Sequence, residues 1–175
     1  YYLYMKVVLL GYMGCGKSVI GDFLAKKVLV SYYDLDHEIE RITQSSITEL
    51  FQSKGEIYFR KKENEILKAL LSNNENFVLS LGGGTPCYYN NHELIAKEGV
   101  LSIYLKASVD TLVNRLIHET EKRPLLHNQD EASLKDFISK HLFDRNFYYH
   151  QATKVINVDN KTIEEIVKEI EVLLA

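Results

Sequence analysis

The run Gly11-Tyr12-Met13-Gly14-Cys15-Gly16-Lys17-Ser18 decides the fold class of this chain. It fills every fixed position of G-x-x-x-x-G-K-[ST], the pattern of a phosphate-binding loop. Apolar residues 7–10 precede it, as in a buried strand, and apolar residues at helical spacing follow it over 19–24. Backbone N–H groups and the helix dipole both favour phosphate at such a junction, so the sequence predicts a site for a phosphorylated ligand.

The last two residues of this run indicate what the loop binds. We expect Lys17 to reach the β- and γ-phosphates of a nucleotide and the Ser18 hydroxyl to bind Mg²⁺. The alternative interpretation is a glycine-rich turn that merely links a strand to a helix. A plain turn has no use for Lys-Ser after its last glycine, so we favour nucleotide binding.

Composition bounds the class of protein. The 175 residues predict one domain, and 46% hydrophobic residues are enough for a packed core. A net charge of −3 argues against nucleic acid as a partner, and no apolar stretch is long enough to cross a membrane. Cys15 and Cys87 lie far apart, so we expect reduced thiols in a cytoplasmic protein. We expect Met5 to be the native start and exclude residues 1–4 from the fold.

Strand and helix patterns alternate along the chain, which predicts an α/β fold with a parallel sheet covered on both faces. Apolar stripes and capping boxes (Ser46 with Glu49, Thr162 with Glu165) mark helices between the strands. The stripe over 163–174 fits packing on the sheet better than binding of a partner. Expected strands lie at about residues 6–10, 29–33, 77–81, 100–105 and 154–158.

Two segments lack strand character. The sequence predicts a helical insert at residues 37–62, after the second strand. It predicts a mobile lid at residues 117–131, where charged residues are dense. Arg123 precedes Pro124 in that lid, which suggests a clamp that closes over phosphates. Arg60, Arg115 and Arg145 lie on predicted helices. Each of these arginines can also be a solvated surface charge, although arginine is the residue best suited to bidentate carboxylate or phosphate binding.

Polar and glycine residues follow two of the predicted strands, where α/β sheets bind ligands. Asp34 and Asp36 are two residues apart, so on an extended chain both side chains would point to the same side. One could hold Mg²⁺ through water while the other orients or deprotonates a hydroxyl; the alternative is a pair that caps a helix near His37. The run Gly82–Gly84 after the third strand indicates close approach of a ligand, or else a flexible turn.

Taken together, these motifs resemble those of the shikimate kinases, over the chain from Met5 to its C-terminus. The loop at 11–18 is similar to that family's Gly-Phe-Met-Gly-x-Gly-Lys-Ser/Thr. Five further matches occur in the family's order, and six motifs in one order are highly specific. These five are Asp34-x-Asp36 with Ile39-Glu40, the segment from Ser46-Ile47 through Phe59-Arg60 to Glu63, Gly82-Gly83-Gly84, Arg123-Pro124-Leu125-Leu126, and Arg145 with Tyr149.

The resemblance implies a P-loop kinase fold and a reaction. The fold is a five-stranded parallel sheet of order 2-3-1-4-5, flanked by helices, with the insert binding substrate and the lid closing over it. The reaction is phosphorylation of the 3-hydroxyl of shikimate by ATP with Mg²⁺, a step towards chorismate and the aromatic amino acids. We expect a monomer whose partners are these small molecules.

The resemblance also assigns site residues. Lys17, Asp36 and Arg123 are implied to be catalytic, and Ser18 and Asp34 to hold Mg²⁺, Asp34 through water. Shikimate is implied to lie among Asp36, the carboxylate-binding Arg60 and Arg145, and the pocket-lining Gly82, Gly83 and Gly84. Implied to contact ATP are Gly14, Cys15, Gly16, Lys17, Ser18, Val19, Arg115, which would stack on adenine, and Arg123.

The sequence departs from the family pattern in two places, and two other functions fit part of its motifs. Residues 26–31 lack the glycine that often precedes the second strand, and Cys15 stands where small residues are usual, which raises the hypothesis that electrophiles modify it. A gluconate or nucleoside monophosphate kinase shares the loop and the fold, but Gly82–Gly84 and Phe59-Arg60 favour shikimate. A non-catalytic nucleotide-binding module is the third possibility; it would be expected to have lost Lys17, Asp36 or an arginine.

Overall fold

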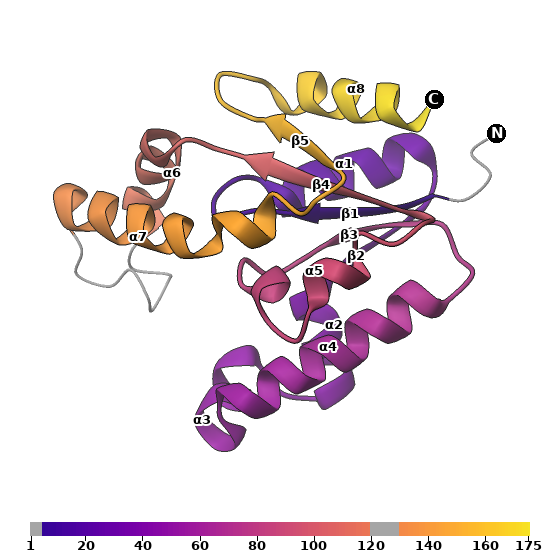
Figure 1. Cartoon of the computed structure of the whole chain (residues 1–175), viewed down its shortest axis with the longest axis horizontal. Coiled ribbons are helices and arrows are strands. Elements are labelled where there is room, and N and C mark those ends of the chain that lie inside the picture. Colours follow the sequence, from indigo (N-terminus) through magenta and orange to yellow (C-terminus); the bar gives the residue numbers. More distant parts are fainter. Residues whose placement is uncertain (1–4, 120–129) are drawn as a thin grey trace.

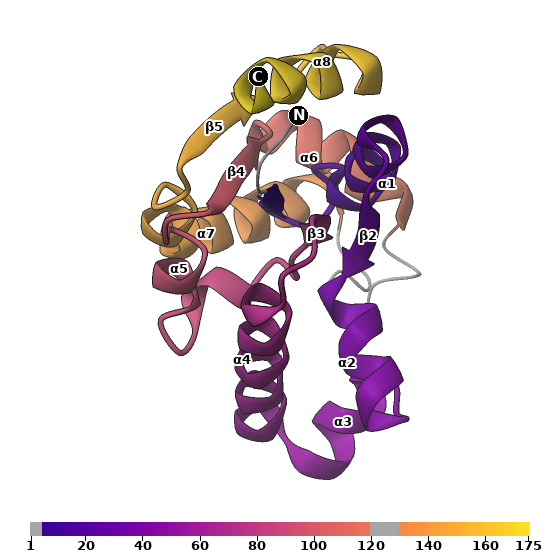
Figure 2. The same ribbon diagram turned by 90° about the vertical axis from the view of Figure 1, so that its right-hand side faces the viewer.

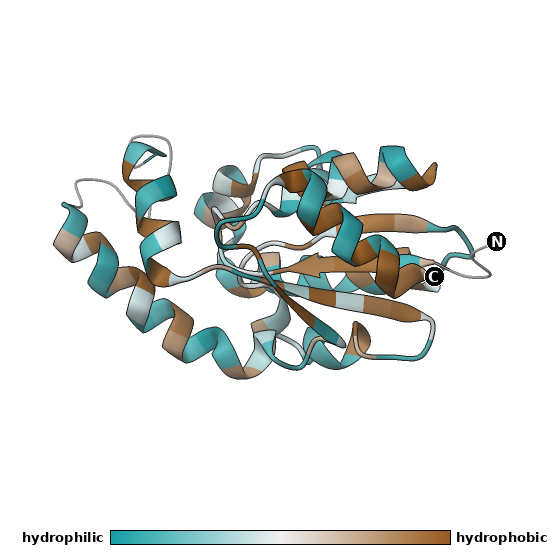
Figure 3. Cartoon of the chain, turned by 90° about the horizontal axis from the view of Figure 1, so that it is seen from above, coloured by the Kyte–Doolittle hydropathy of each residue, from teal (hydrophilic) through white to brown (hydrophobic). Residues whose placement is uncertain are grey.

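A computed structural model describes residues 5–119 and 130–175 of the chain. They form three layers, with one sheet between two layers of helices (Figure 1). Five parallel strands lie in the order β2-β3-β1-β4-β5, which confirms the predicted order. Residues 7–10 in the central strand are completely buried, and Figure 3 shows the strands as the hydrophobic centre of the molecule. The strands are β1 (Lys6–Leu10), β2 (Ser31–Asp34), β3 (Phe77–Ser80), β4 (Val100–Lys106) and β5 (Lys154–Asn157).

Helices cover both faces of the sheet. Figure 2 shows α1 and α8 on one side and α4, α5 and α7 on the other. The insert predicted after the second strand is formed by α2, α3 and the start of α4, which extend away from the sheet (Figure 1). The helices are α1 (Lys17–Val28), α2 (Leu35–Thr43), α3 (Ile47–Lys54), α4 (Glu56–Ser72), α5 (Asn91–Leu94), α6 (Val109–Leu116), α7 (Glu131–Tyr149) and α8 (Ile163–Leu174), with 3₁₀ turns η1 (Thr85–Cys87) and η2 (Ile117–Glu119).

The second strand begins later than the sequence predicted. We expected it at 29–33, but α1 continues to Val28 and β2 starts at Ser31. Leu29 ends the helix in the left-handed conformation, with φ 58°, and its N–H donates to the Ala25 carbonyl. Its side chain is 90% exposed. The apolar run was therefore wrongly read as strand, and Leu29 takes a backbone conformation in which glycine is the usual residue.

The predicted helix starts are confirmed. Ser46 accepts from the N–H of Glu49, whose side chain in turn accepts from the Ser46 N–H, and Thr162 and Glu165 repeat this capping box. Within α8, the apolar stripe packs inward as expected, since Ile166, Val167 and Ile170 are buried in the core.

The predicted lid falls largely outside the part of the chain that the structure describes. Of residues 117–131, Ile117–Glu119 form η2, and Asp130 and Glu131 lie at the start of α7. Arg123 lies outside the described residues. Among the residues that are described, no helix combines the length and apolar character needed to span a membrane.

Candidate active site at the carboxyl ends of the strands

The phosphate-binding loop joins β1 to α1, and two of its glycines have a left-handed backbone. Gly14 and Gly16 adopt φ values of 84° and 102°, which L side chains rarely adopt. Helix α1 begins at Lys17 directly after the loop, without a side-chain cap and without an acidic residue in its first turn. The first N–H groups of a helix have no partner within it, so this end of α1 is suited to an anion.

A cavity of about 490 Å³ opens over this loop. It brings the loop together with Asp34 at the end of β2 and Asp36 in α2, with Gly82 and Gly83 after β3, and with Arg115 on α6. Sequence analysis missed its far wall, formed by Lys161, Ile163 and Ile166. The signal available was the position of these residues directly after the last strand, at the edge where parallel sheets bind ligands. Arg60, Gly84 and Arg145 are not among the residues that line this cavity.

Lys17 and Arg115 both contact the loop itself. The Lys17 ammonium donates to the carbonyl oxygens of Gly11 at 2.7 Å and Tyr12 at 3.1 Å. Arg115 Nη1 donates to the Gly14 carbonyl at 3.0 Å, and its side chain is otherwise exposed. Cys15 is buried, with 1% of its surface exposed. Burial disfavours the hypothesis that electrophiles modify this thiol in the conformation described.

Asp34 caps a helix with one carboxylate oxygen and contacts the phosphate loop with the other. Its Oδ1 accepts from the N–H groups of Asp36 and His37, which caps α2, while its Oδ2 accepts from the Ser18 hydroxyl at 3.3 Å. The geometric argument that Asp34 and Asp36 lie on one extended chain is wrong, because Asp34 ends β2 and Asp36 is already in the first turn of α2. The capping interpretation is correct for Asp34, and both carboxylates nevertheless line the same cavity.

The Asp36 carboxyl lies in surroundings that disfavour its charge. Burial, followed by the neighbouring carboxylates Asp34 and Glu63, raises the pKa of Asp36 to about 6, while Lys17 and Arg60 act in the opposite direction. A carboxyl with such a pKa is largely ionised at neutral pH and can still exchange a proton there.

Arg60 on α4 is held in place from two sides. Its Nη1 donates to Glu63 Oε1 at 2.9 Å, and its guanidinium carbon lies 4.0 Å from the centre of the Tyr88 ring. Glu63 is buried and accepts a second hydrogen bond from the Thr85 hydroxyl at 2.8 Å. Arg60 Nε is buried without a hydrogen-bond partner among the described residues. Glu63 lies three residues after Arg60, a spacing at which two side chains on a helix meet, whereas the contact with Tyr88 has no such local signal.

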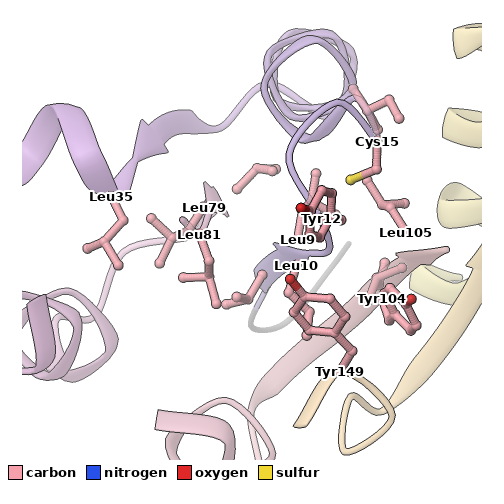
Figure 4. Close-up of a cluster of buried hydrophobic side chains, with 14 of the residues drawn as sticks. Leu9, Leu10, Tyr12, Cys15, Leu35, Leu79, Leu81, Tyr104, Leu105 and Tyr149 are labelled. Carbon is pink, nitrogen blue, oxygen red and sulfur yellow. The ribbon is translucent and has the colours of Figure 1, made fainter. Parts of the chain in front are cut away.

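Arg145 approaches from α7 on the opposite side. Its Nη1 donates to the Tyr149 hydroxyl at 3.5 Å, and that hydroxyl donates to the Gly83 carbonyl at 2.6 Å. Figure 4 shows Tyr149 in the same buried cluster as Tyr104 and Tyr12. The Tyr149 hydroxyl therefore links Arg145 to the glycine run after β3.

The three consecutive glycines are where the predicted substrate residues converge. A methyl group at Gly82 would lie 3.2 Å from Asp36 Oδ1, one at Gly83 would lie 3.1 Å from Arg145 Nη1, and one at Gly84 would lie 2.7 Å from Arg60 Nη2. None of the three has a positive φ. A side chain at these positions would crowd one carboxylate and two guanidinium groups, most severely at Gly84, which favours close packing over a merely flexible turn.

The donor set next to the loop fits Mg²⁺ bound together with a nucleotide. Within the residues that the structure describes, no group of three or more His, Cys, Asp or Glu side chains could hold a metal ion alone. The Ser18 hydroxyl and Asp34 carboxylate nevertheless supply two oxygen ligands on the cavity wall. Mg²⁺ is commonly held by one or two protein oxygens, water and substrate phosphates rather than by a complete protein cage.

Comparison with known proteins gives a consistent result. The family model "Shikimate kinase" matches residues 13–175. The shikimate kinase of Flavobacterium johnsoniae is 54% identical over 170 residues, which cover 97% of this chain and 99% of that protein. Among solved structures, shikimate kinase from Bacteroides thetaiotaomicron has a TM-score of 0.89 at 35% identity, covering 97% of this chain and 98% of that one. Shikimate kinase from Acinetobacter baumannii in complex with shikimate has a TM-score of 0.86 at 28% identity, covering 99% and 94%.

Proposed function

This chain belongs to the shikimate kinase family, and we propose that the residues gathered around Gly82–Gly84 carry out its reaction in the roles given below. The enzyme is an ATP-dependent kinase. It transfers the γ-phosphoryl group of ATP to the 3-hydroxyl of shikimate, which gives shikimate 3-phosphate and ADP on the route to chorismate and the aromatic amino acids.

The observation that carries the assignment of roles is the approach of Asp36, Arg145 and Arg60 to three adjacent glycines. Shikimate has one carboxylate and several hydroxyls. Two arginines from different helices can bind its carboxylate with directed hydrogen bonds, because a guanidinium matches a carboxylate in shape and charge. Asp36, on the side facing the phosphate loop, then orients the reacting hydroxyl or accepts its proton.

On the nucleotide side, the proposal assigns the phosphates to the loop. Lys17 exchanges the carbonyl oxygens that it contacts for the β- and γ-phosphates of ATP, whose charge attracts the ammonium more strongly. The loop from Gly14 to Val19 surrounds the phosphates, and Arg115 stacks on adenine. Arg123, which lies outside the described residues, closes over the phosphates in this proposal.

Ser18 and Asp34 are the residues that would hold Mg²⁺, Asp34 through water. When bound, the ion neutralises charge on the β- and γ-phosphates. The Ser18 hydroxyl and the Asp34 carboxylate already lie next to each other on the cavity wall, joined by a hydrogen bond of 3.3 Å.

We also propose that the enzyme acts as a cytoplasmic monomer. Its cysteines, Cys15 and Cys87, are free thiols, as is usual in a reducing compartment. Light scattering of the purified protein at micromolar concentration tests the monomer, and a mass of twice the chain would contradict it.

Separate replacement of the arginines tests the assigned roles. Losing a charged hydrogen bond costs about 1.5–3 kcal/mol, so Arg60→Ala and Arg145→Ala should each raise the KM for shikimate by roughly ten- to a hundredfold. The KM for ATP should change by less than about twofold. Arg41→Ala is the matched control, because Arg41 is an exposed arginine on the same insert, paired with Glu38. Equal weakening of both substrates would contradict the assignment.

A further inference from the structure

One face of α7 carries three side chains spaced four residues apart. His141, Arg145 and Tyr149 follow one another at helical spacing, so all three face the site. Tyr149 is bonded to Gly83 and Arg145 lies beside it. His141, one turn earlier, contacts the phosphate loop instead. The same helix face therefore joins the two halves of the active site.

The contact with the phosphate loop is made by Tyr12. This residue is 1% exposed, and its hydroxyl is 2.9 Å from His141 Nδ1. The two rings meet edge to face with centroids 5.8 Å apart, and the Phe137 ring also packs on the imidazole, with centroids 4.7 Å apart. The Tyr12 carbonyl also accepts from Lys17. Tyr12 thus contacts both the phosphate-binding lysine and α7.

Arg145 lies between these contacts. Its guanidinium carbon is 5.6 Å from the centre of the Tyr12 ring, and its Nη1 is 3.5 Å from the Tyr149 hydroxyl. An arginine side chain has several rotatable bonds, so its place in a pocket depends on the groups that flank it. Movement of α7 away from the loop would remove the Tyr12 ring from beneath the guanidinium.

The protonation state of His141 supports a directed bond. Burial and, after it, the positive charge of Arg145 lower the pKa of His141, and Asp144 on the same helix opposes them. The imidazole is therefore neutral at pH 7 and has one ring nitrogen that can accept from the Tyr12 hydroxyl.

We propose that Tyr12 and His141 are positioning residues for shikimate: their hydrogen bond holds α7 against the phosphate loop and thereby sets Arg145 against Gly83. The inference rests on the proposed role of Arg145 in binding the substrate carboxylate. Neither Tyr12 nor His141 touches shikimate in this account. Loss of their bond should weaken shikimate binding and leave the chemistry of phosphoryl transfer intact.

The test removes the bond from each side. Tyr12→Phe, His141→Leu and the double variant are compared by calorimetric titration with shikimate and by initial rates. Since one hydrogen bond contributes about 0.5–1.5 kcal/mol, each single variant should weaken shikimate binding by roughly three- to tenfold. The double variant should be no weaker than the singles. His141→Asn, which keeps an acceptor near Nδ1, should restore binding to within about twofold of the parent chain.

Controls separate positioning from general damage. Tyr33→Phe also deletes a phenol hydroxyl, but that hydroxyl bonds to exposed Glu75 and should leave shikimate binding unchanged. Unchanged shikimate affinity in Tyr12→Phe and His141→Leu would overturn the inference, as would equal weakening of ATP and shikimate. If Tyr12→Phe does not fold, His141→Leu and His141→Asn decide. Arg145→Ala is measured in parallel. If it weakens shikimate binding while the Tyr12 and His141 variants do not, the inference fails and the proposed carboxylate site stands; if it does not weaken binding, the carboxylate site itself fails.

Discussion

Asp36 is the residue whose environment bears most directly on the reaction. Its pKa is raised to about 6, chiefly by burial and then by Asp34 and Glu63. Only the ionised carboxylate can accept a proton from shikimate. We therefore expect kcat/KM for shikimate to fall about tenfold per pH unit below pH 6 and to be level above pH 7. Rates measured from pH 5 to 8 check this, with ATP binding over the same range as the control for acid unfolding. A level profile down to pH 5 would contradict it.

Replacing the same carboxylate should separate activity from stability. Asp36→Asn should lower kcat at least about a hundredfold while ATP affinity changes by less than about twofold. A raised pKa means that the native state holds its proton more tightly than the unfolded chain, so ionisation costs stability as pH rises from about 4 through 6. The neutral variant avoids that cost and should be more stable above pH 7 by roughly 1–3 kcal/mol.

Chemical denaturation at pH 8 and pH 4 measures this difference. The gain in the free energy of unfolding should be present at pH 8 and nearly absent at pH 4, where Asp36 of the parent chain is already protonated in the native state. An Asp36→Asn variant that is less stable than the parent at pH 8, or one with near-normal turnover, would remove Asp36 from the assigned role.

Leu29 is strained by its backbone rather than by its contacts. A left-handed conformation costs a non-glycine residue about 1–2 kcal/mol, and the exposed leucine gains little from burial. Leu29→Gly should therefore be more stable than Leu29→Ala by about 1 kcal/mol, because alanine keeps the strain and glycine loses it. Thermal unfolding of the two variants provides the measurement. Equal melting temperatures would show that this turn carries no strain.

Among the elements, the turn between β3 and η1 contacts the residues proposed to bind substrate. A methyl group on Gly84 would come within 2.7 Å of Arg60 Nη2, and Arg60 has little room to move between Glu63 and Tyr88. Gly84→Ala should raise the KM for shikimate more than about tenfold and leave the KM for ATP within about twofold. Steady-state rates with each substrate varied in turn would show this. An unchanged KM for shikimate would mean that Arg60 does not bind it.

The element pattern explains which parts of the fold could be predicted. Buried runs, capping boxes and the glycine loop are local signals, so four strands and the helix starts were placed correctly. The error at β2 arose because Val28-Leu29-Val30 fits either a strand or the end of a helix. The hydrogen bonds of Leu29 and Val30 to the Ala25 carbonyl decide between them, and they are not visible in the sequence.

The sequence predicted only those parts of the site whose residues form a motif within a short stretch of chain. The phosphate loop and the carboxylates Asp34 and Asp36 could be predicted from the residues alone. The joint role of Arg60 and Arg145 in binding one carboxylate came from the family resemblance. These two arginines belong to α4 and α7, and only tertiary packing brings them to one glycine run. The Tyr88 stack and the Tyr12–His141 bond join residues far apart in sequence and left no pattern to detect.

At the scale of the whole molecule, a parallel sheet brings distant segments to one edge. The carboxyl ends of β1, β2 and β3 carry the phosphate loop, Asp34 and Gly82–Gly84, and the chain after β5 adds the far wall of the cavity. The insert supplies Arg60 from one side of this edge and α7 supplies Arg145 from the other. In the proposed assignment, the fold thus places a nucleotide site beside a site for a small carboxylate with hydroxyl groups.

This enzyme phosphorylates shikimate, so we expect its pocket to reject other small alcohols and nucleotides. Shikimate-dependent ADP release by the purified protein, with ATP and Mg²⁺ and with gluconate and AMP in parallel reactions, is the decisive measurement. We expect turnover with shikimate alone. Turnover with gluconate or AMP, or no turnover with shikimate by a protein that still binds ATP, would contradict the function while leaving the fold in place.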